Sequence, residues 1–186
     1  KEKCRYSSVI LDCYWQPGFD DGHPEFFRPS LRIDPFLWAY APNKKNRDGT
    51  SFAELHRPDL GDLEGLCAYM KESIQAFKAK GAVALKSAIA YERGIDFSPR
   101  GAEEAALALA LGEGAGEAEV DAFQSYMFFA ACRLAGETGT PFQVHTGLGG
   151  LRRTRALHLI DAIEAHPETS FVLFHGSYPW SDDICA

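Results

Sequence analysis

Three short apolar runs in the second half of the chain each end in a polar side chain that can act as a ligand. The runs are Ala82–Leu85 before Lys86, Pro141–Val144 before His145, and Phe171–Phe174 before His175. Amphipathic segments separate them. Continuous apolar strands that alternate with helices are typical of parallel sheets buried on both faces. The sequence therefore predicts an α/β fold whose strands run in parallel.

Apolar side chains recur at every third or fourth position in the segments between these runs, which is the spacing of one helix face. This periodicity predicts helices over Leu63–Phe77, Ser98–Leu111 (with Ser98 as its N-cap), Val120–Gly136 and Leu151–Ala165. Two further strands are expected near residues 9–14 and 29–34.

The composition excludes several classes of protein. Of the 186 residues, 46% are apolar and 24% are charged, as in ordinary globular domains, and the formal net charge of -7 lacks the basic footprint of general nucleic-acid binding. No apolar run approaches the roughly 18 residues of a membrane span, and the charged start of the chain does not resemble a signal peptide. The 5 cysteines are scattered and form no CxxC pair, so we expect free thiols in a reducing cytoplasm.

The polar residues at the three strand ends are expected to meet. Parallel strands share one carboxyl edge, where α/β folds place active sites, and alternation puts Lys86, His145 and His175 on one face. Gln143 shares the face of His145 and would form a hydrogen bond with the substrate or with metal-bound water. His145 and His175 lie 30 residues apart (175−145), one β/α unit, and so on neighbouring strands. Two imidazoles at this position suit a divalent metal, of which zinc is the first candidate. Alternatively, each is a structural histidine of the core or of a loop.

Lys86 and the residues that follow it admit several roles. A lysine at a buried strand end can be an ion-pair partner, a base of depressed pKa, or a CO2-carboxylated bridge between two metals; a solvent-reaching side chain is the structural alternative. Tyr91 and Arg93 would hold a substrate carboxylate or pack their loop. Tyr178 would line the pocket or pack against its neighbours. His56 lies in a polar segment and is expected to be exposed.

Three segments resemble motifs of one known family. They are Lys86–Gly94, Pro141–Gly147 and Phe171–Trp180, and their order and spacing are similar to those of the amidohydrolase superfamily. The subgroup is the amidohydrolase-2 type, which includes the amidohydrolase-like domain fused to glutamine synthetase in nodulin-like and FluG-like proteins. The resemblance covers the chain from roughly Val9 onward and implies a distorted (β/α)8 TIM barrel that carries out metal-dependent hydrolysis.

The resemblance also implies roles for individual residues. His145 matches the fifth-strand metal ligand, His175 the sixth-strand histidine that is a ligand or a catalytic residue, and Lys86 the fourth-strand lysine, a metal ligand or catalytic group. The sequence lacks the first-strand His-x-His pair, and no aspartate replaces that of the eighth strand. Because a complete barrel takes about 250 residues, residues 1–186 are expected to form a single incomplete barrel domain with about strands 2–6.

These observations lead to one expected function and two alternatives. We expect a metal-dependent hydrolase that cleaves a C–N bond of a small amide or cyclic amide with metal-activated water, an activity that belongs to the intact barrel. A decarboxylase or isomerase on the same barrel is the first alternative. A non-catalytic α/β module that binds a partner is the second, and unpaired sheet edges would favour association, including a homo-oligomer.

Overall fold

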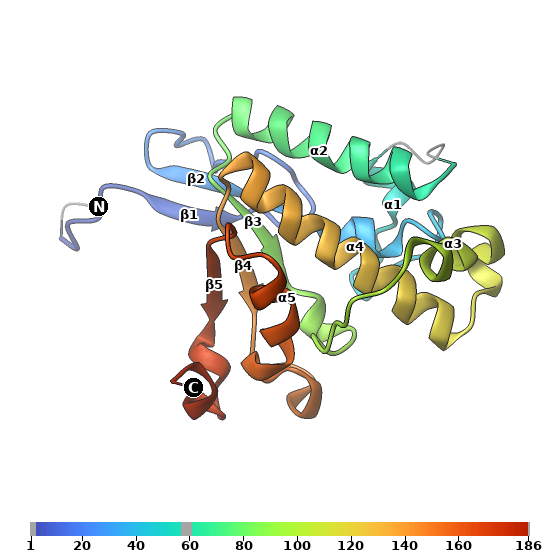
Figure 1. Ribbon diagram of the computed structural model, residues 1–186. Helices are drawn as coiled ribbons and strands as arrows, with labels where there is room; N and C mark the ends of the chain where they lie inside the picture. Colours follow the sequence, from blue (N-terminus) through green and yellow to red (C-terminus); the bar gives the residue numbers. More distant parts are fainter. Residues whose placement is uncertain (1–2, 57–60, 186) are drawn as a thin grey trace.

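Five parallel strands form one curled sheet in the computed structural model, which describes residues 3–56 and 61–185 (Figure 1). The strands are Val9–Asp12 (β1), Phe27–Arg32 (β2), Ala84–Ser87 (β3), Phe142–His145 (β4) and Phe171–Phe174 (β5). Each strand pairs with the next along the chain, in the order β1-β2-β3-β4-β5. Parallel strands that pair in chain order, with helices between β2 and β3, β3 and β4, and β4 and β5, form the wall of a β/α barrel, which confirms the predicted partial TIM-barrel fold.

Helices cover the outer side of this sheet. They are Phe52–Leu55 (α1), Leu63–Ala79 (α2), Ala102–Leu111 (α3), Glu117–Thr138 (α4) and Ile160–Ala165 (α5). The helices α2, α4 and α5 lie on one side of the sheet, and α3 packs against α4 (Figure 1). The predictions that correspond to α2 and α4 are confirmed, with slightly longer helices. Within the described ranges, no helix combines the length and the apolar character needed to cross a bilayer.

The predicted start of α3 is wrong. The helix begins at Ala102, and its N-cap is Gly101 rather than Ser98. The Gly101 N–H donates to the carboxylate of Glu104 at 3.1 Å, so a glutamate three residues along the chain satisfies the backbone N–H at the helix start. A Ser-Pro pair is therefore a misleading start signal when a better-placed acidic residue follows.

The helix expected over residues 151–165 is much shorter in the structure. Only Ile160–Ala165 is α-helical, and 3-10 turns precede it. Thr154 is tied to Gly147, because the Gly147 N–H donates to the Thr154 carbonyl at 2.6 Å and the Thr154 hydroxyl donates to the Gly147 carbonyl. These bonds hold the segment against the loop after β4, and that contact prevails over the helical periodicity.

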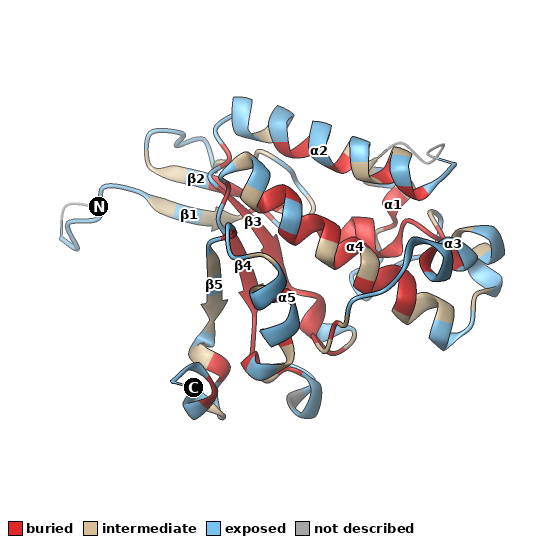
Figure 2. Cartoon of the chain, in the orientation of Figure 1, coloured by how far each residue is buried: buried red, intermediate tan, exposed pale blue. Residues whose placement is uncertain are grey.

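The strand register divides the side chains of the sheet into two sets. Arg32 pairs with Lys86, which pairs with Gln143, and residues paired across parallel strands share a face. These polar side chains lie on the inner face. The alternate positions, such as Leu85 and Phe142, face the helices and form the core. Figure 2 shows burial concentrated in β3, β4 and the side of α4 that faces them.

His56 is not exposed as predicted. Its ring lies among Phe36, Phe52 and Tyr69, with ring centroids 4.7, 5.0 and 5.7 Å away. The side chain closes the aromatic cluster between α1 and α2. Burial lowers the pKa of the His56 imidazole from 6.5 to about 4.

We expect this histidine to make the fold sensitive to acid. Between pH 6.5 and about 4, the unfolded chain protonates His56 while the folded chain keeps it neutral. The free energy of unfolding should therefore fall as the pH is lowered through this window, by at most about 1.4 kcal/mol per pH unit. Urea denaturation at about pH 7 and about pH 5 measures this slope.

A matched pair of variants isolates the contribution of His56. His56→Phe should flatten the slope, whereas His23→Phe should leave it intact, because the side chain of His23 is 64% exposed. An unchanged slope in His56→Phe would contradict the assignment.

Candidate functional site

His145 ends β4 at the carboxyl edge of the sheet and is 3% exposed. Its Nε2 contacts the carbonyl oxygen of Leu148. A carbonyl only accepts, so Nε2 carries the proton and Nδ1 presents its lone pair. Burial lowers the pKa of the imidazole, which keeps the ring neutral at neutral pH. A neutral, oriented imidazole is the form that binds a metal.

The ring of His175 lies beside that of His145, with centroids 4.6 Å apart. Strand alternation does not explain this contact, and that part of the prediction is wrong. Phe174 is the residue in register with His145, so His175 would continue onto the helix side with Leu173. The chain instead leaves the strand, and His175 adopts a left-handed φ of 63°. A turn, rather than the pleat of β5, brings the two rings together.

Hydrogen bonds fix the turn that carries His175. The hydroxyl of Thr146 donates to the carbonyl of Phe174 at 2.6 Å and accepts the N–H of Ser177 at 3.0 Å. The Ser177 hydroxyl donates to the Asp183 carboxylate at 3.2 Å. Sequence reasoning assigned no role to these residues, and the only signal was that Thr146 directly follows a candidate ligand.

Lys86 lies within β3 rather than just beyond it, and it is 3% exposed. Its Nζ lies 3.2 Å from the centroid of the Phe174 ring. Burial lowers the pKa of the lysine to about 8; the neighbouring Arg32 also lowers it, while Asp12 opposes both. The alternative of a solvent-reaching lysine is therefore wrong, and the amine lies close to its titration range at neutral pH.

Arg32 neighbours Lys86 but is fully engaged in an ion pair. Its Nε and Nη2 donate to the two oxygens of Asp12 at 2.9 and 2.8 Å. The guanidinium also lies over the rings of Tyr14 and Trp15, 4.3 and 4.9 Å from their centroids. Among the described residues, no carboxylate forms an ion pair with Lys86, whereas the neighbouring Arg32 is paired with Asp12.

The predicted substrate-binding residues fall into two groups. Gln143 is buried on the inner face level with Lys86, and the ring of Tyr91 lies 4.5 Å from that of His145. Tyr178 follows the His175 turn and is 59% exposed. Arg93 is not brought to the strand ends. It donates to Gln124 at 3.0 Å and Asp121 at 2.9 Å, so its guanidinium faces α4.

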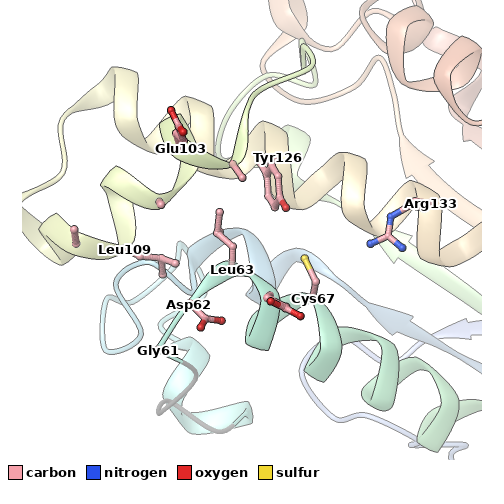
Figure 3. A pocket seen from close by; sticks show the side chains of 12 residues that line it. Gly61, Asp62, Leu63, Cys67, Glu103, Leu109, Tyr126 and Arg133 are labelled. Atoms are coloured by element: carbon pink, nitrogen blue, oxygen red, sulfur yellow. The ribbon is translucent and has the colours of Figure 1, made fainter.

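Cavity size alone does not select the site. A cavity of about 820 Å³ lies outside the barrel wall among α2, α3 and α4, lined in part by Cys67, Tyr126 and Arg133 (Figure 3). None of the predicted site residues lines it. A smaller cavity of about 200 Å³ lies at the ends of β2 and β3, where Arg32 and Tyr91 contribute to its wall.

Comparison with known families identifies the chain. A family model described as Amidohydrolase matches residues 53–185, a range that contains all three strand-end residues. The chain belongs to the amidohydrolase family. No curated protein sequence matches it at a significant level.

Solved structures share the fold of this amidohydrolase chain. A protein from Lactobacillus casei ATCC 334, described as a metal-dependent hydrolase, superposes with a TM-score of 0.68 at 18% identity, over 94% of this chain and 46% of that one. The uronate isomerase of Thermotoga maritima gives a TM-score of 0.62 at 17% identity, over 90% of this chain and 43% of that one. The amidohydrolase chain therefore spans less than half the length of these structures.

The donor set of the amidohydrolase chain fits part of a metal site. His145 and His175 offer two neighbouring imidazoles, the ligands that zinc commonly takes from proteins. Catalytic zinc sites use three protein ligands, and residues 3–56 and 61–185 contain no cluster of three histidine, cysteine, aspartate or glutamate side chains. The described residues could therefore supply two of the three ligands and do not complete the set.

Proposed function

We propose that this chain forms part of the active site of a metal-dependent hydrolase, where it binds the substrate and supplies some of the metal ligands. The proposed reaction is hydrolysis of a C–N bond in a small amide or cyclic amide. The observation that carries the proposal is the pair of histidine rings 4.6 Å apart at the carboxyl edge of a parallel sheet. Buried Lys86 lies on the adjacent strand and faces the same interior. Metal ligands beside a titratable group are the parts that such hydrolysis needs.

In this proposal His145 and His175 hold the metal, with zinc preferred because both ligands are imidazoles. When bound, a divalent metal supplies Lewis acidity and lowers the pKa of water. Lys86 moves or holds a proton, because burial has lowered its pKa to about 8. Its ammonium form also stabilises negative charge that develops on the substrate. Carboxylation of Lys86 remains the alternative that would turn it into a metal ligand.

Gln143 and Tyr91 bind the substrate in this proposal. The amide of Gln143 is level with Lys86 on the inner face, and the Tyr91 ring contacts His145 at 4.5 Å. Tyr178 is placed on the turn that carries His175, where its exposed ring would border the bound molecule. Arg93 acts at a distance, because its ion pair with Asp121 anchors the loop that bears Tyr91.

A decarboxylase or isomerase on the same scaffold is the alternative reaction. The structure of a uronate isomerase shares the fold at a TM-score of 0.62, so this scaffold accommodates more than hydrolysis. We also propose that the enzyme is cytoplasmic, acts on a small molecule, binds neither nucleic acid nor membrane, and forms a homo-oligomer.

Zinc binding tests the proposal directly. Competition with a chromophoric chelator measures the affinity of the wild-type chain. We expect His145→Ala and His175→Ala each to weaken it by more than about tenfold, because losing even an outer-shell partner of a ligand costs about 10–100-fold. His23→Ala is the matched control, because that histidine is exposed and lies beside the amino end of β2, at the opposite edge of the sheet from His145. Zinc affinity that is equal in all three variants and the wild type would contradict the proposed site.

A further inference from the structure

We propose that Thr146 is the positioning residue that sets the spacing between the rings of His145 and His175. The inference rests on the proposed function for its consequence, since the spacing matters only if the two rings act together. The hydrogen bonds and the ring spacing themselves involve only residues of this chain. The side chain of Thr146 is completely buried and directly follows His145 in the sequence.

One hydroxyl group holds both flanks of His175. Thr146 Oγ1 donates to the carbonyl of Phe174, which precedes His175, at 2.6 Å. The same oxygen accepts the N–H of Ser177, two residues after His175, at 3.0 Å. The bonds use the donor and an acceptor site of the hydroxyl, so the turn is fixed to the residue next to the other histidine.

The turn needs such an anchor because its backbone is unfavourable. His175, Gly176 and Ser177 have φ values of 63°, 53° and 59°, in the left-handed region that residues with a Cβ rarely adopt. Such conformations persist only where surrounding contacts determine them. Without the Thr146 hydroxyl, we expect the turn to relax and the ring of His175 to move away from His145.

A second set of bonds holds the far side of the turn but not the histidine. Ser177 Oγ accepts the N–H of Ala156 at 2.8 Å and donates to Asp183, whose carboxylate also accepts from Arg155 at 2.6 and 3.1 Å. These contacts tie Ser177 to the segment before α5. Thr146 differs because it links the turn to the end of β4, where His145 lies.

The test compares ring proximity in isotopically labelled, metal-free protein. The wild type and Thr146→Ser, which keeps the hydroxyl, should show a nuclear Overhauser effect between the ring protons of His145 and His175. Thr146→Val preserves the branched shape but removes the hydroxyl, and it should reduce this signal at least threefold. Thr146→Ala removes the same hydroxyl without branching and serves as a second variant if Thr146→Val does not fold. A signal of wild-type intensity in a folded variant without the hydroxyl would overturn the inference.

A matched variant separates positioning from general stability. Thr169 is also buried, and its hydroxyl donates to the carbonyl of Cys132 at 2.7 Å; it precedes the start of β5, at the amino edge of the sheet, opposite the carboxyl edge that bears His145. Thr169→Val removes the same kind of bond and should lower the midpoint of unfolding while leaving the ring-to-ring signal intact. Loss of the signal in Thr169→Val as well would reduce Thr146 to a stabilising residue.

A zinc titration of the same variants distinguishes failure of this inference from failure of the proposed function. We expect Thr146→Val to bind zinc at least tenfold more weakly than the wild type and Thr146→Ser to bind within threefold of it. Equal affinity and equal ring proximity in wild type and Thr146→Val would overturn positioning and leave the metal site standing. A wild-type chain that binds no zinc, but loses ring proximity in Thr146→Val, would overturn the metal proposal alone.

Discussion

Replacing Gly147 with alanine is expected to destabilise the chain by about 3 kcal/mol or more, because two penalties coincide at this position. A Cβ on Gly147 would lie 2.8 Å from the Tyr178 nitrogen and 2.9 Å from the Ser177 carbonyl carbon, and closer still to the Tyr178 carbonyl oxygen. All three are backbone atoms, which cannot rotate out of the way. The residue also has a φ of 74°, in the left-handed region. Urea denaturation of Gly147→Ala against the wild type measures the loss.

Gly139→Ala separates the clash from the backbone strain. Gly139 follows α4 with a φ of 59°, and a Cβ there would meet no atom within 4 Å. It should cost only the left-handed penalty, about 1–2 kcal/mol. If Gly147→Ala cost no more than Gly139→Ala, the close approach of the β4 loop to the His175 turn would be wrong.

Replacing Phe142 with alanine is expected to cost about 3–5 kcal/mol, the range for removing a buried aromatic ring. Phe142 is fully buried, and its ring lies 5.5 Å from that of Phe128 and 6.2 Å from that of Phe171. It joins β4, α4 and β5 at one point. Because whole domains are stable by only about 5–15 kcal/mol, this single change removes a large part of the total.

Two further variants frame this result. Phe142→Leu keeps most of the volume and should retain a folded chain if Phe142→Ala does not fold. Val172→Ala, on the neighbouring strand, should change stability by less than about 0.5 kcal/mol, because Val172 is 42% exposed on the inner face. Comparable losses for Val172→Ala and Phe142→Ala would contradict the assignment of inner and outer faces.

The sequence was sufficient to predict the strands that carry the site, because each is a short apolar run between amphipathic segments. Lys86 and His145 lie on the inner face as predicted, since both follow directly from strand alternation. Their position at the carboxyl edge follows from the parallel sheet. Local hydrophobic patterning is therefore sufficient to predict the parallel α/β sheet, whereas the partial barrel was implied by the resemblance to the amidohydrolase superfamily.

Features that depend on tertiary contacts could not be predicted in this way. His175 reaches His145 through a left-handed turn, and no local pattern distinguishes that turn from a continuing strand. His56 looks solvent-exposed because its neighbours in sequence are polar, but its neighbours in space are aromatic. The sequence allowed Arg93 either to bind substrate or to pack its loop, and it could not show that the partner of Arg93 is Asp121, on a helix 28 residues along the chain.

The strict division of the sheet into inner and outer positions has a consequence for how such a chain can evolve. Phe142 and Val144 belong to the core, whereas Gln143 and His145 belong to the site, so the two functions occupy alternate codons of one gene segment. Point substitutions can change either set independently of the other. A single-codon deletion within β4 would exchange the two sets, placing polar groups against the helices and apolar groups in the site. Diversification of this strand is therefore expected to proceed by substitution, and tolerated insertions should be confined to the loops beyond its ends.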